Sequence, residues 1–334
     1  MKIGLIDVDG HNFPNIPLMK ISAYHKSQGD EVVWYDPMFT GHCDKVYVSK
    51  VFSFSPDFEY FIDADEVNYG GSGYCIELVG GQEIYDKSKD IDLPPEIEHI
   101  YPDYSLYFND NDLEYDNEEE EWLGLSSREL RKRDTAYGFL SRGCPRGCSF
   151  CHVEAKEGRA SRKVADLKEF WNGQKNIVLC DPNILACRQW KDLLQQLIDS
   201  KAWVDINQGL DIRLMTPEKA VMLKQIKMKS FHFAWDRYED KERILPKFKM
   251  FKDITGYRDR DLIVYVLCNF DTTIEQDLER IYTLREMGYW AYVMLYDKEN
   301  IPKDHDLRKL QRWVNNRFVF AKCETFEEYK RGIT

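Results

Sequence analysis

The sequence predicts an α/β fold in two parts, and three observations support this prediction. Short apolar, β-branched segments alternate with helical segments along most of the chain, a pattern typical of parallel sheets. The chain has 334 residues, which is more than one small domain usually contains. A strongly acidic segment at 110–121 separates the two parts. We therefore expect an N-terminal open parallel sheet, a linker and a larger set of βα units.

The composition and net charge argue against several functional classes for this protein. Hydrophobic residues make up 43% of the chain and charged residues 31%, which is enough apolar material for a core. The formal net charge of −12 argues against broad binding to a nucleic acid backbone, which needs patches of Lys and Arg. Nine cysteines are scattered and do not form a disulfide framework. No apolar run has the length of a membrane span or a signal peptide, so we expect a cytoplasmic protein with no membrane partner.

The first part, residues 1–107, has the pattern of a small doubly wound, Rossmann-like domain. Gly29 and Asp30 separate a helical segment from the strand that follows, as a helix stop should. The last predicted strand runs into a glycine-rich turn at 70–73. We expect a helix at 16–28 and strands at 2–8, 31–35, 44–52 and 66–69.

Residues 108–134 are predicted to be an acidic linker. Eight of the twelve residues at 110–121 are acidic, and like charges at this density repel and favour a solvated segment over a functional acidic patch. Six βα units follow at 135–300, and 301–334 is expected to cap them. The expected strands are 136–142, 176–181, 203–207, 230–236, 262–268 and 290–296, and the expected helices are 164–171, 186–199, 217–227, 239–253, 274–287 and 306–314.

The most specific motif lies directly after the first of these strands. Cys144, Cys148 and Cys151 have the spacing Cys-x3-Cys-x2-Cys. Three thiolates on one loop can hold three irons of a cubane iron–sulfur cluster and leave the fourth iron open, whereas electron-transfer clusters usually have four thiolates. The alternative is a zinc site, but His152 adjoins Cys151 and is poorly placed to complete a tetrahedron.

This loop resembles the signature of the radical S-adenosylmethionine (radical SAM) superfamily. The resemblance implies a partial (β/α)6 barrel and a [4Fe–4S] cluster whose open iron binds S-adenosylmethionine. It also implies one-electron cleavage of that molecule to methionine and a 5′-deoxyadenosyl radical, which abstracts hydrogen from a substrate. Reduced flavodoxin or ferredoxin is the expected electron donor. The resemblance does not identify the substrate, the product or the residue that quenches the substrate radical.

The same resemblance suggests cofactor-binding residues near the cysteines and after the second strand. Phe150 matches an aromatic position that packs near the adenine, or else it simply packs the loop. Asp181 and Asn183 lie at the tip of the second strand, where family members bind the methionyl amine. A carboxylate suits an ammonium group, but helix capping explains these two residues equally well.

Further candidates follow the later strands. Arg213 could grip a carboxylate of the cofactor or the substrate, or pair with Asp211. Asp236 matches the region that binds the ribose hydroxyls, and Asn269 lies where the adenine is usually held. His232 is predicted to lie on the inner face of the fourth strand. It is either a pocket residue or a core histidine whose hydrogen bonds are made within the protein.

The first part resembles the cobalamin-binding-like domain found in one branch of the superfamily. Asp9 and His11 have the separation of the loop that supplies a lower histidine ligand to cobalamin. Pro14 stands where that loop has glycine, and proline removes the backbone freedom needed beside a corrin. We therefore expect a degenerate domain that binds no cobalamin tightly. The alternatives are a cobalamin-dependent radical SAM methyltransferase and, in another class, an iron–sulfur electron-transfer or sensor protein.

Overall fold

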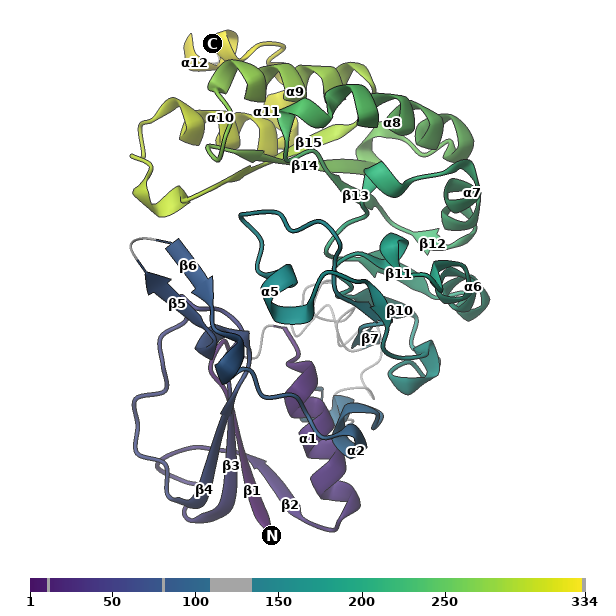
Figure 1. The fold of residues 1–334 in the computed structure, drawn as a ribbon. Helices are drawn as coiled ribbons and strands as arrows, with labels where there is room; N and C mark the ends of the chain where they lie inside the picture. Colours follow the sequence, from purple (N-terminus) through teal and green to yellow (C-terminus); the bar gives the residue numbers. More distant parts are fainter. Residues whose placement is uncertain (11–12, 80–81, 109–133, 332–334) are drawn as a thin grey trace, which may run out of the picture. The chain divides into compact units, whose positions relative to one another are not determined.

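The computed structural model describes residues 1–10, 13–79, 82–108 and 134–331 (Figure 1). The predicted acidic segment at 110–121 and His11 lie outside the described residues. The chain divides into two compact units, Met1–Val178 and Leu179–Thr334. Helices alternate with parallel strands in both units, so the predicted α/β class is confirmed. Within the described residues, no helix is both long and apolar enough to cross a membrane.

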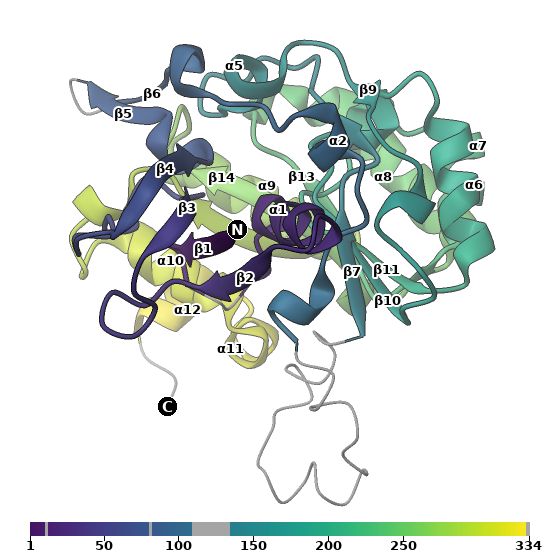
Figure 2. The same ribbon diagram turned by 90° about the horizontal axis from the view of Figure 1, so that it is seen from below.

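The first unit begins with a parallel sheet of four strands in the order β2-β1-β3-β4. Lys2 pairs with Glu31 in β2, and Ile3 pairs with Lys45 in β3. Helix α1 lies against one face of this sheet (Figure 2). These elements match the predicted ones to within a few residues: β1 Lys2–Asp7, α1 Ile16–Ser27, β2 Glu31–Trp34, β3 Cys43–Ser49 and β4 Ala64–Gly70.

Alternation along β1 divides the core of this sheet into two layers, because successive side chains of a strand point to opposite faces. Ile3 and Leu5 are fully buried in a cluster with Leu18 of α1. Ile6 packs on the other face with Val46 and neighbouring apolar residues. The sheet is thus covered on both faces, which is the usual arrangement for parallel strands.

A hairpin and short helices follow the sheet within the first unit. The hairpin strands β5 and β6 are antiparallel, and β7 and β10 are neighbours in another sheet. The expected strand 136–142 is divided into two shorter strands, β7 and β8. The bounds of these elements are β5 Ile76–Val79, β6 Gln82–Tyr85, α2 Pro95–Glu98, β7 Thr135–Gly138, β8 Ser141–Arg142, α5 Val153–Glu157, β9 Arg162–Lys163 and β10 Asn176–Leu179.

The helix predicted at 164–171 is wrong. Only one 3-10 turn forms there, at Leu167–Glu169, held by a capping box between Asp166 and Glu169. The chain then leaves the helical path because the Phe170 ring packs on Gly138, where an added Cβ would lie 2.5 Å from the ring. The Phe170 carbonyl also accepts a hydrogen bond from the Tyr104 hydroxyl at 2.7 Å.

The second unit continues the alternation of strand and helix. Strands β11 and β12 pair in parallel, and β13, β14 and β15 form a parallel sheet in that order. A lone parallel bridge joins Leu210 to Phe233. Every strand and helix predicted for this unit is present within a few residues: α6 Trp190–Ser200, β11 Trp203–Ile206, α7 Pro217–Gln225, β13 Phe231–Ala234, α8 Lys241–Thr255, β14 Leu262–Cys268, α9 Ile274–Glu286, β15 Trp290–Leu295 and α10 Asp306–Asn315. The structure adds three short elements that were not predicted: β12 Lys227–Met228, α11 Arg317–Lys322 and α12 Phe326–Arg331.

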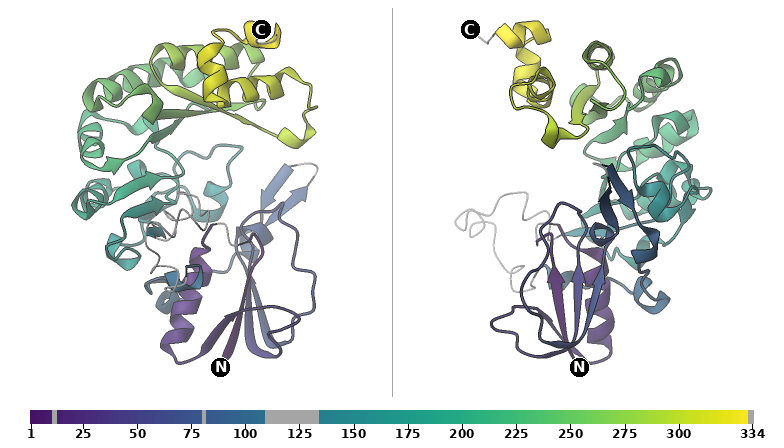
Figure 3. Two further views of the ribbon diagram at one scale, coloured as in Figure 1. Left: turned by 180° about the vertical axis from the view of Figure 1, so that it is seen from behind. Right: turned by 60° about the vertical axis from the view of Figure 1, so that its left-hand side comes forward.

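Helices α8, α9 and α10 lie on one side of the β13-β14-β15 sheet (Figure 3). Phe231 and Phe233 of β13 are fully buried, and both rings contact Phe251 of α8, with centroids 5.1 Å and 5.0 Å away. His232 lies between them in the alternating burial pattern and faces away from the helices. The predicted alternation of this strand is therefore confirmed.

The outer edge of β15 is covered by side chains of α10. The Asn315 amide accepts a hydrogen bond from the Val293 N–H at 2.8 Å and donates one to the Val293 carbonyl at 3.0 Å. Gln311 donates a second hydrogen bond to the same carbonyl at 3.1 Å. These contacts fix α10 against the sheet and satisfy backbone groups that a sheet edge leaves open.

Candidate functional site

The three cysteines of the motif lie on a loop closed by a short ladder in the first unit. Strands β8 and β9 are antiparallel, with Arg142 opposite Arg162, so the loop leaves and returns at the same place. Cys144 and Cys148 are half-buried, and Cys151 is exposed. The Cys151 N–H donates to the Cys148 carbonyl at 3.0 Å, and the Cys144 N–H donates to the Gly158 carbonyl at 3.2 Å.

A nearly buried carboxylate, Glu157, holds the base of this loop. Its side chain is only 7% exposed. It accepts a hydrogen bond from the Gly143 N–H at 2.9 Å and lies 3.4 Å from the Arg142 guanidinium. Gly143 has a φ of +91°, and a Cβ there would lie 2.2 Å from the Ala160 carbonyl oxygen. The residue before Cys144 must therefore be glycine, and Glu157 fixes its amide.

Sequence reasoning missed Glu157. The available signal was an acidic residue at the end of a short helix, directly before Gly158 and close to Arg162. Arg162 donates to the Glu157 carbonyl at 2.8 Å. Phe150 is half-buried in the same loop, and His152 is the N-cap residue of α5 but makes no side-chain cap hydrogen bond.

Three soft thiol donors on an anchored, solvent-reachable loop suit iron–sulfur chemistry. Each ligand of a cubane cluster binds a different iron, so the ligands need not meet at one point. Among the residues that the structure describes, no group of three or more His, Cys, Asp or Glu side chains could hold a metal ion. The fit to a cluster therefore depends on the donor set and on the anchoring of the loop.

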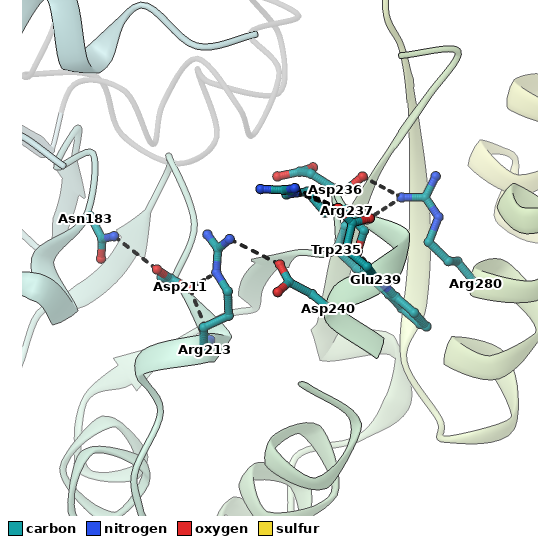
Figure 4. A network of polar contacts seen from close by, with 9 residues as sticks. All are labelled: Asn183, Asp211, Arg213, Trp235, Asp236, Arg237, Glu239, Asp240 and Arg280. Atoms are coloured by element: carbon teal, nitrogen blue, oxygen red, sulfur yellow. Dashed lines mark hydrogen bonds and ion pairs between the residues drawn. The ribbon is translucent and has the colours of Figure 1, made fainter. Parts of the chain in front are cut away.

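The second unit contains a polar network at the carboxyl ends of its strands (Figure 4). Asn183 donates to Asp211 at 3.3 Å. The Arg213 guanidinium donates to Asp211 at 2.7 Å and to Asp240 at 3.3 Å. The carboxyl ends of parallel strands are where α/β sheets bind ligands. The network brings together Asn183 and Arg213, two of the predicted site residues, although they lie far apart in the sequence.

Arg213 is already engaged within this network. The ion pair with Asp211, which the sequence left open as an alternative role, is present. Asp240 was missed by sequence reasoning and shares the same guanidinium. Asp211 also accepts a hydrogen bond from the Arg213 N–H at 3.1 Å, which fixes the turn after β11.

Asp236 follows β13 and is the most perturbed carboxylate of this region. Burial raises the pKa of its carboxyl to about 6, although the positive charges of Arg213 and Arg280 act in the opposite direction. Among the described residues, none donates a hydrogen bond to this carboxylate. A buried carboxylate with a raised pKa and open acceptor positions is typical of a functional site.

The other predicted residues differ in their burial and in their contacts. Asp181 is fully buried and Asn183 is 3% exposed. Asn269 has a left-handed φ of 66°, and its amide donates to the Tyr296 carbonyl at 3.0 Å. The His232 ring lies 3.8 Å from the Asp205 carboxylate, and burial lowers its pKa. Asn269 thus stabilises a turn and is not a member of the Asp211 network.

A buried cation, Arg280 of α9, holds the backbone on which Asp236 lies. Its guanidinium donates to the carbonyls of Trp235 at 2.6 Å and Asp236 at 3.0 Å (Figure 4). It also donates to the Leu267 carbonyl of β14 at 2.8 Å and to Asp277 at 2.5 Å. Arg280 therefore joins the ends of two neighbouring strands.

The sequence contained a signal for this arrangement. Asp277 and Arg280 occupy the same helical face as Ile281 and Leu284, and all four are fully buried. A charged pair in an apolar helical stripe needs an internal partner. The sequence pattern predicted a helix at 274–287 but not the buried ion pair within it.

Comparisons with models of protein families and with curated proteins found no match to this sequence. Each unit is therefore interpreted from its own chemistry. The first unit contains a loop with three thiols. The second unit, taken by itself, contains a network of carboxylates and arginines at strand ends.

Proposed function

We propose that this protein is a radical SAM enzyme, in which the βα units form a partial (β/α)6 barrel and the N-terminal sheet is a degenerate cobalamin-binding-like domain. One observation carries the proposal: three thiols lie on a single loop that is anchored at both ends directly after a buried strand. Soft thiolates with that spacing suit a [4Fe–4S] cluster with one open iron. The substrate on which the radical acts is not part of the proposal.

In this proposal, residues of the cysteine loop bind the cluster and hold the loop in place. Cys144, Cys148 and Cys151 would hold the cluster, which would supply the electron for cleavage of S-adenosylmethionine. Glu157 keeps the loop in place through the Gly143 amide. Phe150 is half-buried in the same loop and would pack near the adenine. Within the first unit, these residues would thus hold the cluster and surround it.

The second unit would bind and orient the nucleoside. Asp236 ionises above a pH of about 6 and then offers acceptor oxygens to the two ribose hydroxyls. Its position is set by Arg280, which binds the Asp236 carbonyl at 3.0 Å. Asp181 and Asn183 are proposed to receive the methionyl amine, and Asn269 to lie at the adenine end. Arg213 is already paired with Asp211. We therefore propose that it orients the Asp211 carboxylate and does not bind a carboxylate of the cofactor or the substrate.

The N-terminal sheet is proposed to act as a scaffold. The Asp9 carboxylate accepts hydrogen bonds from the Val51 N–H at 2.5 Å and the Ser55 hydroxyl at 2.6 Å. Asp9 follows β1, and the two donors follow β3, so these bonds tie together the loops at the point where strand order reverses. Open α/β sheets bind ligands at this point. The internal contacts support a domain that binds no cobalamin tightly.

The test is cleavage of S-adenosylmethionine under reducing, anaerobic conditions. After reconstitution with iron and sulfide, the protein should release 5′-deoxyadenosine when reduced flavodoxin or ferredoxin is supplied. The variant C144A/C148A/C151A should lose both the cluster absorption and this product. The matched control Cys43→Ala removes a buried thiol outside the loop and should retain both.

The outcomes separate the competing functions. A protein that retains iron and releases no 5′-deoxyadenosine is an iron–sulfur electron-transfer or sensor protein. Stoichiometric cobalamin together with methyl transfer would favour the methyltransferase. Full iron retention in the triple cysteine variant would defeat the assignment of the cluster.

A further inference from the structure

A hollow at the C-terminal helices of the second unit is lined by none of the candidate site residues described above. It has a volume of about 690 Å³ and is lined by Arg312, Asn315, Asn316, Arg317, Phe318, Val319 and Tyr329. Ligand-binding sites commonly have volumes of roughly 300–1,000 Å³. The hollow forms because Asn316 both ends α10 and caps the first turn of α11, where its side chain accepts a hydrogen bond from the Val319 N–H at 3.2 Å.

Two arginines line this hollow without an acidic partner. Among the described residues, neither the Arg312 nor the Arg317 guanidinium forms an ion pair or a hydrogen bond. Arg317 instead lies over the Trp290 ring, 5.0 Å from its centroid. Lys309, on the same helix as Arg312, is by contrast paired with Asp306 at 2.9 Å. In a chain with a net charge of −12, two unpaired arginines in one hollow favour an anionic ligand.

The hollow also offers an aromatic surface. Phe318 is 89% exposed, so its ring is open to contact by a ligand. Tyr329 lines the same hollow and is half-buried against the Phe326 ring, with the two ring planes 22° apart. A bare aromatic ring beside arginines is the combination on which nucleic acid bases stack while their phosphates are neutralised.

The frame around the hollow is firmly held. Trp313 of α10 is fully buried, and the centroid of its ring lies 4.9 Å from that of Phe320 in α11. Arg285 of α9 donates to the Glu324 carbonyl at 2.6 Å, directly after α11. The exposed Phe318 and the two arginines are therefore presented by a fixed corner between helices.

We propose that this hollow binds a nucleotide unit, with its phosphate at Arg312 and Arg317 and its base stacked on Phe318. Arg binds phosphate through a planar fork of donors. The Asn315 amide is occupied by the Val293 backbone, and the Asn316 oxygen by Val319. Few groups are left to read base edges, so binding depends on charge and stacking and has little base preference.

This inference does not depend on the proposed radical chemistry, and it can be tested on protein without iron. The nucleotide unit can come from a single strand or from a free mononucleotide. The 334-residue chain is titrated into fluorescein-labelled 12-mers of oligo(U) and oligo(dT) at 50–200 mM salt, with anisotropy as the signal. Unlabelled uridine 5′-monophosphate is then added as a competitor.

The variant R312Q/R317Q should bind the 12-mers at least about ten-fold more weakly at low salt. Its plot of log affinity against log salt should be shallower by about 0.7, because the two arginines are proposed to neutralise one phosphate and each neutralised phosphate of a single strand contributes about 0.7. Phe318→Ala should weaken binding by roughly five-fold to 150-fold, the value of one stacked base, and should keep the salt slope. Phe318 is not in the core, so this variant should fold normally.

A matched control removes two positive charges elsewhere in the same unit. Lys249 and Arg258 are exposed and each is paired with an aspartate, so K249Q/R258Q should bind within about two-fold of the unmodified chain. Displacement by the mononucleotide supports a free nucleotide as the ligand, and binding without displacement supports a single strand. Equal weakening in both double variants, or no binding of either probe at 50 mM salt, would overturn the proposal.

Discussion

Arg280 and Asp277 form an ion pair at 2.5 Å in which neither side chain is exposed to solvent. The guanidinium also binds backbone carbonyls of Trp235, Asp236 and Leu267. Burying a charged pair costs desolvation free energy. The hydrogen bonds from Arg280 to the backbone carbonyls help to offset this cost. The pair thus holds in place the strand ends that carry the proposed nucleoside site.

Removing one partner of this pair should destabilise the protein strongly. We expect Arg280→Met to lower the free energy of unfolding by about 3–5 kcal/mol, because it leaves a buried carboxylate unpaired. Urea unfolding followed by circular dichroism measures this change. Arg258→Met removes an exposed arginine paired with Asp261 and should cost less than about 1 kcal/mol. Similar losses in the two variants would show that the buried pair has no special role.

The raised pKa of Asp236 predicts a stability effect with a definite sign. Its carboxyl ionises near 3.8 when exposed and at about 6 in the fold, so between these pH values the folded state binds more protons. Ionisation of this group therefore reduces stability as pH rises from about 4 to about 6. Relative to the unmodified protein, Asp236→Asn should gain up to about 3 kcal/mol at pH 7 and little at pH 4. A gain that is equal at both pH values would contradict the assignment, and Asp253→Asn on the surface is the control.

The same group predicts the pH dependence of cofactor binding. Ribose hydroxyls donate to the ionised carboxylate, so affinity of the reconstituted protein for S-adenosylmethionine should increase as pH rises from 5 to 7. Asp236→Ala should weaken binding by about 1–3 kcal/mol, and Asp236→Asn should remove the pH dependence. Equilibrium dialysis with labelled S-adenosylmethionine measures both effects. Unchanged affinity in the alanine variant would remove Asp236 from the site.

Glu157 should control the cysteine loop without binding iron. Glu157→Ala leaves the Gly143 N–H without its acceptor, so we expect faster alkylation of the three loop thiols and lower iron content after reconstitution. Glu157→Gln keeps an oxygen acceptor and should largely restore both. The control Glu154→Ala removes a more exposed carboxylate of the same helix, which pairs with Arg159. Equal iron content in all three variants would contradict this role of Glu157.

The N-terminal sheet should bind no cobalamin tightly. Asp9 ties the loop after β1 to Val51 and Ser55, and Pro14 removes backbone freedom from the same loop. Equilibrium dialysis with hydroxocobalamin should show no stoichiometric binding at micromolar concentration. Tight binding would instead promote the methyltransferase function.

The sequence predicted the succession of elements well, because local periodicity is visible in one chain. The alternation of Phe231, His232 and Phe233 gave the correct buried face of β13. The helix predicted at 164–171 does not form, because the conformation of this segment depends on a tertiary contact, the packing of Phe170 on Gly138. Propensity alone cannot reveal such a contact.

The candidate site was predicted less completely than the fold. The cysteine spacing is local, so the sequence displays it directly. The partners that hold the site come from distant segments: Asp240 reaches Arg213 across 27 residues, and Arg280 reaches Trp235 across 45. A single sequence carries no sign of which distant carboxylate or carbonyl a given arginine will bind.

The amide of Asn315 acts on Val293 as a further strand would, because it supplies one donor and one acceptor to the same residue of β15. A peptide from another molecule would have to displace Asn315 before it could extend this sheet. A shortened chain that stops before α10 would lose that protection and present a sheet edge lined by the exposed Tyr292 and Met294. The C-terminal helices thereby guard against self-association, and removing them should turn a well-behaved chain into one that aggregates through its last strand.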